Sequence, residues 1–216
     1  AITSSPTGRF IYIAAAQFIA GTPAVPAVAE SSGVAAVAAI PAKPAYYGQV
    51  QSINISNPAS PVLGTPIKML YAPTHIAASP LNNYVYISAE KSTGQLQEIG
   101  GANLVDYPIY VLRVSDQRLW GTVNNTAMPI LNQDWRFTSS NSVNLLSVSP
   151  DANRLFISTD NNKEFMQIPI PQGAGDEGDF NFESIRSVVL NSKATAWEFL
   201  AEAQTLWINL ADQTVV

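Results

Sequence analysis

The amino-acid sequence predicts an all-β fold of the β-propeller class, in which small radial sheets surround a central axis. Three observations favour this class. A short segment recurs along the chain, a run of alternating aromatic and aliphatic residues follows each copy, and the spacing of the copies allows one sheet for each. The composition agrees, because 47% of the 216 residues are hydrophobic and only 12% are charged, which is typical of a folded β-rich protein.

The repeat is centred on a Ser-Pro pair. Three copies align without gaps and begin at Ser5, Ser79 and Ser149; they read SPTGRFIYIA, SPLNNYVYIS and SPDANRLFIS. Proline presets the backbone of a turn, and the glycine or asparagine that follows tolerates a left-handed conformation. The residues after the turn are aromatic or β-branched, as strands prefer. Each copy is therefore predicted to form a strand, a tight turn and a second strand.

A fourth copy lacks the Ser-Pro pair. Its residues Leu206-Trp207-Ile208 align with Leu155-Phe156-Ile157, so Trp207 takes the place of the repeat aromatic and is expected to lie in the core. These two copies lie about 51 residues apart, close to the roughly 40–50 residues of a propeller blade. The earlier copies are further apart, which indicates inserted loops.

Two insertions are predicted, at about residues 18–46 and 124–140, within a single partial propeller domain that spans residues 1–216. The first is a low-complexity Ala/Val/Pro segment whose prolines forbid a central strand or a helix. It is interpreted either as an elongated arm or as a mobile linker. The second contains Trp135 and Phe137, which are expected to anchor the loop.

The strands can be assigned blade by blade, from the innermost strand outward. The expected ranges are 2–5, 10–14, 48–55 and 62–68 in the first blade; 74–79, 83–89, 109–114 and 119–123 in the second; 145–149, 154–159, 164–168 and 184–190 in the third; and 196–200 and 206–210 in the fourth, with a third strand starting at 215. Because open sheet edges invite association, we expect a longer chain or another subunit to complete the ring.

The sequence resembles two related propeller groups. The Ser-Pro-x-Gly/Asn-x-aromatic-x-Tyr-Ile pattern is similar to the YVTN-type and lactonase-like repeat, and residues 50–64 resemble the LVIVD repeat, in which an outward strand ends in Asp-Pro-x-x-Pro-Val. The resemblance implies a propeller fold. It implies little about activity, because propellers include enzymes, scaffolds and receptors.

The only histidine, His75, follows Pro73 and Thr74. This run is similar to a Pro-Arg-His run of phosphogluconolactonase-like propellers, in which a glutamate, here Glu90, ends the next strand. The resemblance implies that His75 acts as a general base, supported by Glu90, on a sugar lactone. Thr74 replaces the family's arginine, so Arg113 and Arg154 are the candidates to supply a cation. The alternative is a packed or channel-lining histidine without a chemical role.

Other kinds of chemistry find little support. The chain has no cysteine and one histidine, so neither disulfides nor a transition-metal site is expected. The net charge of −5 and the absence of a basic run argue against a nucleic-acid partner, and the apolar stretch from Val34 to Ile40 is too short to span a membrane. No cofactor is expected; calcium at the acidic loops 160–162 and 176–179 is the lesser alternative. Two glycosylation sequons occur, at residues 54–56 and 124–126.

The sequence is interpreted as a non-enzymatic β-propeller that serves as an interaction or structural module in an extracellular, cell-surface or virion assembly. Loops on rigid blades commonly carry binding residues, and a nearly uncharged arm suits contact with a protein partner or further subunits. The residues expected to make these contacts are Val25, Val28, Val34, Val37, Ile40, Trp135 and Phe137. The alternative function is a lactonase-like enzyme that uses His75 and Glu90.

Overall fold

A computed structural model describes residues 1–23, 25–27, 46–81, 84–90, 109–115, 117–119, 142–160, 163–170, 186–200 and 205–212. Every regular element in these ranges is a β-strand, and all pairings between strands are antiparallel. The predicted all-β class is confirmed.

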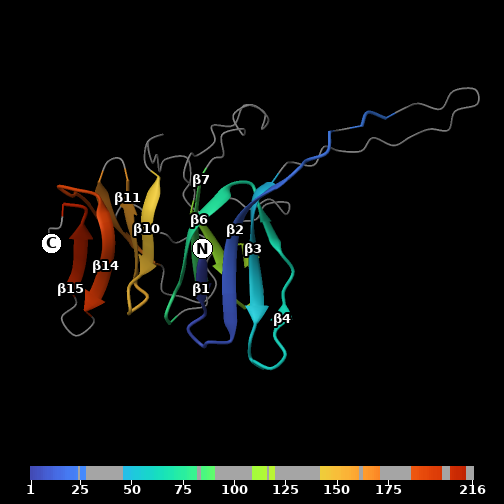
Figure 1. Cartoon of the computed structure of the whole chain (residues 1–216), viewed down its shortest axis with the longest axis horizontal. Coiled ribbons are helices and arrows are strands. Elements are labelled where there is room, and N and C mark those ends of the chain that lie inside the picture. The colour runs from blue at the N-terminus through green and yellow to red at the C-terminus, as the bar shows by residue number, and fades with distance from the viewer. Residues whose placement is uncertain are drawn as a thin grey trace, which may run out of the picture.

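The strands form four sheets that follow one another in chain order, from blue and cyan on the right of Figure 1 to red on the left. Blade 1 contains β1 (Ile2–Ser4), β2 (Phe10–Ile19), β3 (Tyr46–Asn54), β4 (Val62–Leu63) and β5 (Ile67–Met69), with β4 and β5 both paired to β3. Blade 2 contains β6 (Ala72–Ala78), β7 (Tyr84–Glu90), β8 (Ile109–Arg113) and β9 (Arg118–Leu119). Blade 3 contains β10 (Val143–Val148), β11 (Arg154–Thr159), β12 (Glu164–Pro169) and β13 (Arg186–Val189), and blade 4 contains β14 (Ala194–Leu200) and β15 (Thr205–Leu210).

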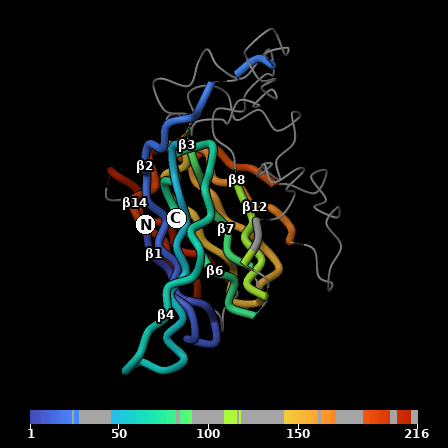
Figure 2. The backbone as a smooth tube through the Cα atoms, turned by 90° about the vertical axis from the view of Figure 1, so that its right-hand side faces the viewer, coloured from blue at the N-terminus to red at the C-terminus, as the bar shows by residue number. Residues whose placement is uncertain are grey.

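Within each blade the strand order follows the chain, as the sequence predicted, and neighbouring blades meet through their first strands. Strand β6 contacts β1 and β10, and β10 contacts β14. Figure 2 shows β1 and β14 on one side of the molecule, with β8 and β12 on the other. The main difference from prediction is the length of β2, which continues to Ile19 and pairs there with Tyr46. The start of a third strand at residue 215 lies outside the described residues.

Successive side chains on each strand face opposite blades, because strand geometry repeats every two residues. On β7, Val85 and Ile87 belong to the core between blades 1 and 2, whereas Tyr86 belongs to the core between blades 2 and 3. A third core lies between blade 3 and blade 4 and includes Phe156 and Ile208. The middle blades therefore bury both faces, which is the layer arrangement of a propeller.

The repeat aromatic always points toward the next blade along the chain. Tyr12 and Tyr86 are fully buried, and Phe156 is 3% exposed. Trp207, at the equivalent position of β15, is 50% exposed, so the expectation that it lies in the core was wrong. Its neighbour Ile208 faces blade 3, which directs Trp207 the other way, where the described residues contain no further sheet.

The Ser-Pro turns close the hairpins through the serine as well as the proline. The N–H of Ser149 donates to the carbonyl of Arg154 (2.9 Å), and the N–H of Arg154 donates to the Ser149 hydroxyl (3.0 Å). Ser5 makes the same pair of bonds with Phe10. Ala152 holds the left-handed position of the third turn (φ 57°), where the first turn uses a glycine. The buried serine hydroxyl thus replaces a missing strand partner at each of these two turns.

Replacing Ser149 with alanine is expected to lower the free energy of unfolding by about 1–3 kcal/mol, because the N–H of Arg154 loses its acceptor. The hydroxyl of Ser149 also donates to Asp151, and that bond is lost as well. The matched control is Ser60→Ala, at an exposed serine in the loop between β3 and β4. Urea unfolding of both variants measures the effect, and equal midpoints would show that the serine contributes only a turn conformation.

Candidate functional site

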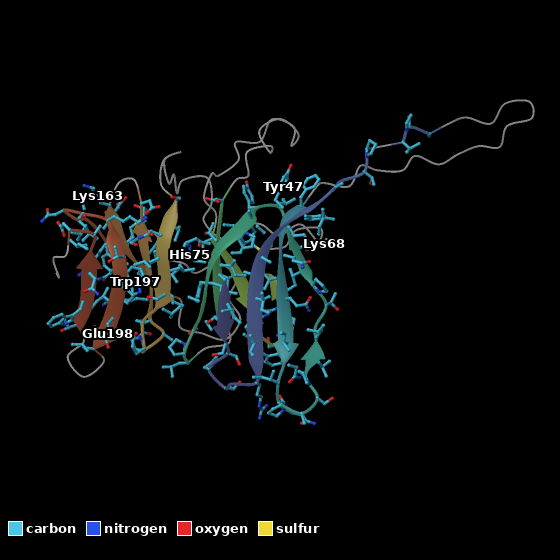
Figure 3. The ribbon with its side chains drawn as sticks, viewed as in Figure 1. Tyr47, Lys68, His75, Lys163, Trp197 and Glu198 are labelled. Carbon is cyan, nitrogen blue, oxygen red and sulfur yellow. The ribbon has the colours of Figure 1, made fainter. Side chains whose placement is uncertain are left out.

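The candidate site lies at the end of the blades where β6, β10 and β14 begin and where β7 and β11 end, drawn at the top of Figure 1. We call this the upper end. Three long connections join strands here: residues 20–45 after β2, residues 91–108 after β7 and residues 120–142 before β10. Both predicted insertions therefore connect to the same end of the molecule as His75, which Figure 3 labels.

A β-bulge at the start of β6 positions His75. Pro73 pairs with Ala89 and His75 with Ser88, so Thr74 is the extra residue between them. The Thr74 hydroxyl lies 2.9 Å from the Ser88 hydroxyl, which also accepts a hydrogen bond from the N–H of His75 (3.2 Å). Bulges redirect side chains and commonly adjoin functional sites. The bulge fixes the backbone of His75 on blade 2.

The same bulge occurs at the start of the first strand in blades 3 and 4. Asn144 is the extra residue of β10, and Thr195 is the extra residue of β14. The Asn144 amide donates to the carbonyl of Ala194, which links the two blades, and the Thr195 hydroxyl donates to the carbonyl of Asn209 (3.1 Å). Sequence reasoning missed this feature; its signal is a polar residue two or three positions into each apolar first strand.

His75 is half-buried, and its Nδ1 atom is fully enclosed without a hydrogen-bond partner in the part of the chain that the structure describes. Burial, and to a lesser degree the positive charge of the N-terminal ammonium group, lowers the pKa of His75, and the carboxylate of Asp160 opposes this shift only in part. His75 is thus a neutral imidazole at pH 7. A neutral imidazole can accept a proton or a hydrogen bond but supplies no positive charge.

Glu90 ends β7 and pairs with Ala72, which places it on the same face of blade 2 as Ser88 and His75 by the two-residue alternation. Glu90 and His75 therefore lie at one end of blade 2. No hydrogen bond joins His75 to Glu90 among the described contacts. Glu90 and His75 are thus near each other at the upper end of blade 2 without a direct hydrogen bond.

The two arginines proposed as cation donors lie at the opposite, lower end, so that expectation was wrong. Arg113 pairs with Tyr84, the first residue of β7, and Arg154 is the first residue of β11. Glu90 lies six residue steps along β7 from Tyr84, a distance of roughly 20 Å. The sequence showed the residues near strands, but only the direction of each strand decides which end they occupy.

One ammonium group at the upper end belongs to Lys193, and it is already paired. Lys163, which precedes β12, lies at the same end, and its Nζ donates to the carbonyl of Asn191 (3.2 Å). The Nζ atom of Lys193 lies 2.5 Å from Oδ1 of Asp160, and the two side chains are 45% and 35% exposed. The pair argues against calcium at the acidic loop 160–162, because the Asp160 carboxylate already contacts the Lys193 ammonium. Within the described ranges, no three His, Asp or Glu side chains gather in a way that suits a metal ion.

Much of the predicted partner surface lies outside the described residues. This applies to Val28, Val34, Val37, Ile40, Trp135 and Phe137, to the acidic loop 176–179 and to the second sequon. Val25 is described and is 43% exposed. Asn54 of the first sequon is the last residue of β3, and its side chain accepts a hydrogen bond from the N–H of Ser56. The described part contains no helix long and apolar enough to cross a membrane.

An aromatic surface that the sequence did not predict lies where the first insertion leaves blade 1. Phe18 is 65% exposed, and its ring centroid lies 5.3 Å from that of Tyr47. The Nζ atom of Lys68 lies 5.5 Å from the centroid of the Tyr46 ring. We call Phe18 and Tyr47 the arm-root surface; Tyr47 and Lys68 are labelled in Figure 3. Its sequence signal is the Tyr46-Tyr47 pair directly after the low-complexity segment.

His75 is expected to make stability depend on pH below neutrality. Since its folded pKa lies below the unfolded value, the unfolded chain binds a proton first. The contribution is fully present above about pH 6.5 and is lost as pH falls through the folded pKa. Because His75 is the only histidine, its pKa can be measured from a single imidazole NMR signal. In His75→Gln, the fall in stability between pH 7 and 5.5 should be smaller; an unchanged fall would contradict the assignment.

Comparison with known proteins supports the fold. No family model matches the sequence, and no curated protein matches it. Among solved structures, the chain is similar to dihydro-heme d1 dehydrogenase NirN in complex with DHE, with a TM-score of 0.52 and 11% identity over 98% of this chain and 32% of that one. It is also similar to Kuenenia stuttgartiensis hydrazine synthase, with a TM-score of 0.56 and 10% identity over 100% of this chain and 69% of that one.

Both of these neighbours are β-propeller proteins, so the chain has the β-propeller fold. It spans about a third of the length of the first neighbour. At 10–11% identity the similarity establishes the fold alone.

Proposed function

We propose that this chain is a non-enzymatic β-propeller of the YVTN/LVIVD repeat type that binds a protein partner at its upper end, within an extracellular, cell-surface or virion assembly. The observation that carries the proposal is the gathering of features at one end. Three of the four long connections and the arm-root surface adjoin the upper end. The fourth, residues 170–185 between β12 and β13, joins strands at the lower end, where the turns between the first two strands of blades 1 and 3 are short and internally hydrogen-bonded.

The arm-root surface has the composition of a protein interface. Tyrosine and phenylalanine are enriched in such interfaces, and they supply large contact areas at little entropic cost. Phe18 exposes most of its ring to solvent although it packs on Tyr47. Strand pairing between Ile19 and Tyr46 anchors this surface on blade 1, so a partner would meet a rigid platform.

The second candidate function is lactonase-like catalysis, and the observation that favours it is the neutral, half-buried His75 on the same face as Glu90. The cations that the sequence proposed for an anionic substrate are not beside His75, because both arginines lie at the lower end, and the Lys193 ammonium faces Asp160. We therefore place it second. No cofactor is part of either proposal.

The test is a quantitative capture experiment with the whole chain. Wild type, Phe18→Ser and Leu81→Ser are immobilised and exposed to surface and secreted proteins of the source organism. Leu81 is the matched control, since it is 71% exposed at the lower end. A specific partner should be retained by wild type and Leu81→Ser and reduced at least tenfold by Phe18→Ser. Equal retention by all three would contradict binding at the arm-root surface.

A parallel assay tests the second candidate function, lactonase-like catalysis. Wild type and His75→Ala are incubated with sugar lactones, and hydrolysis is followed by acid release. The proposed function predicts no turnover above the buffer rate for either protein. Turnover that depends on His75 would overturn the non-enzymatic proposal and establish the alternative.

A further inference from the structure

Two sheet faces lack a neighbouring sheet within the described part of the chain. One is the face of blade 4 that points away from blade 3, which we call the trailing face; its residues are Ala196, Glu198, Leu200, Thr205, Trp207 and Asn209. The other is the face of blade 1 that points away from blade 2, which we call the leading face; its apolar residues are Ile2, Ile11, Ile13, Ala15, Ile53 and Leu63.

The three interfaces between successive blades show which residues pack together when two sheet faces meet. Each blade contributes its repeat aromatic, and the next blade receives it on aliphatic residues at fixed repeat positions. Tyr12 shares a core with Val85 and Ile87 of blade 2. Tyr86 shares the next core with Leu155 and Ile157 of blade 3. The same contact therefore occurs twice with equivalent residues, and Phe156 repeats it against Ile208 of blade 4.

The trailing face carries the aromatic without a receiver. Trp207 is 50% exposed, whereas the residues at the equivalent positions, Tyr12, Tyr86 and Phe156, are at most 3% exposed. Leu200 on the same face is 40% exposed. Tryptophan is enriched in protein interfaces, because burial of its large ring contributes strongly to binding.

The leading face carries the receiving positions of the repeat, and no sheet covers them in the described residues. Ile11 and Ile13 occupy the repeat positions of Val85 and Ile87, which receive Tyr12 inside the chain. Ile13 pairs with Ile2, which is 66% exposed. The strands of blade 1 contain no Asp or Glu, so Glu198 of the trailing face would meet no like charge there.

We propose that the trailing face of one copy of this chain packs on the leading face of a second copy, with Trp207 seated on Ile11 and Ile13 of its partner. The contact is head-to-tail, so it occurs twice in a closed pair. The four described sheets of each copy would give the pair eight sheets, within the known range of about four to eight blades. Tyr47 of the arm-root surface lies at the upper edge of the leading face, because it shares a face of β3 with Ile53, so the two proposed contacts adjoin each other.

Two single substitutions at exposed positions test it. Trp207→Glu places a charge on the trailing face, and Ile2→Glu places one on the leading face. Leu81→Glu, at an equally exposed site away from both faces, is the control. Light scattering after size exclusion is expected to give twice the 23.1 kDa chain mass for wild type and the control, and the single-chain mass for each variant. Circular dichroism establishes that all four proteins are folded.

Mixing the two variants distinguishes this contact from other dimers. A mixture of Trp207→Glu and Ile2→Glu retains one intact interface per pair and should regain the dimer mass at higher concentration. A symmetric dimer that pairs two trailing faces would not be restored by mixing, and that result would overturn the proposal. So would a wild-type chain that stays monomeric, or one that forms open filaments.

Discussion

Gly48→Ala is expected to lower the free energy of unfolding by about 3 kcal/mol, because a methyl group has no room at this position of β3. A Cβ atom there would overlap the Pro73 ring and lie 2.7 Å from the carbonyl oxygen of Tyr71. Neither obstacle can rotate away, since one is a ring fixed to the backbone and the other is the backbone itself. Strand β3 must therefore move away from the start of β6.

Gly64→Ala is the matched control. A Cβ atom at Gly64 would meet chiefly the Ser52 hydroxyl, which is the end of a rotatable side chain. We expect a smaller loss there, below about 1.5 kcal/mol, because the serine can change rotamer. Urea unfolding of the two variants measures the difference. Midpoints that agree within error would show that blade 1 and blade 2 adjust their separation freely.

The same substitution reports on the candidate site. Pro73 directly precedes the bulge that fixes His75, so displacing Pro73 should shift the imidazole signal and its pKa. At a concentration of urea well below the transition, the NMR signal of His75 in Gly48→Ala is expected to differ from wild type, while Gly64→Ala leaves it in place. The structural role of Gly48 is thereby linked to the upper end.

Local sequence predicted the strands well because each strand depends on near neighbours. The Ser-Pro pair sets a turn, and the alternation that follows decides which side chains share a face, so the hairpins of blades 1 and 3 follow from about ten residues each. The order of strands within a blade follows from the same repeat. These features need no knowledge of distant parts of the chain.

The errors concern properties that depend on distant residues. Trp207 occupies the same position of the repeat as Phe156, but burial requires a following blade, and the described residues contain none. Arg113 and Arg154 lie in strands of blades 2 and 3, but at the lower end and not at the upper end with His75. Only the direction of each strand decides this. The bulge at Thr74 was missed because a single polar residue in an apolar strand has no unique local interpretation. The roles of His75 and Glu90 stay predictions.

Phe156→Ala is expected to have the largest effect, about 3–5 kcal/mol, because it empties the centre of the core between blades 3 and 4. The ring is 3% exposed and stacks on Phe165 and Phe199, with centroids 5.7 Å and 6.2 Å away. Phe165 in turn meets the edge of Trp197. A cavity here cannot collapse easily, since rigid sheets hold both walls.

We expect Phe156→Ala to destabilise blade 4 more than the other blades. In the described residues, the hairpin of β14 and β15 has two strands and one buried face, and isolated hairpins are only marginally stable in water. Hydrogen exchange of Phe156→Ala is therefore expected to show amides of Ala194–Leu200 and Thr205–Leu210 losing protection while blade 2 keeps its own. Phe18→Ala, which removes an identical side chain that is 65% exposed, should change stability by less than about 1 kcal/mol. Uniform loss of protection in Phe156→Ala would mean that the blades unfold as one unit. It would also mean that blade 4 is held by more than the single core that contains Phe156.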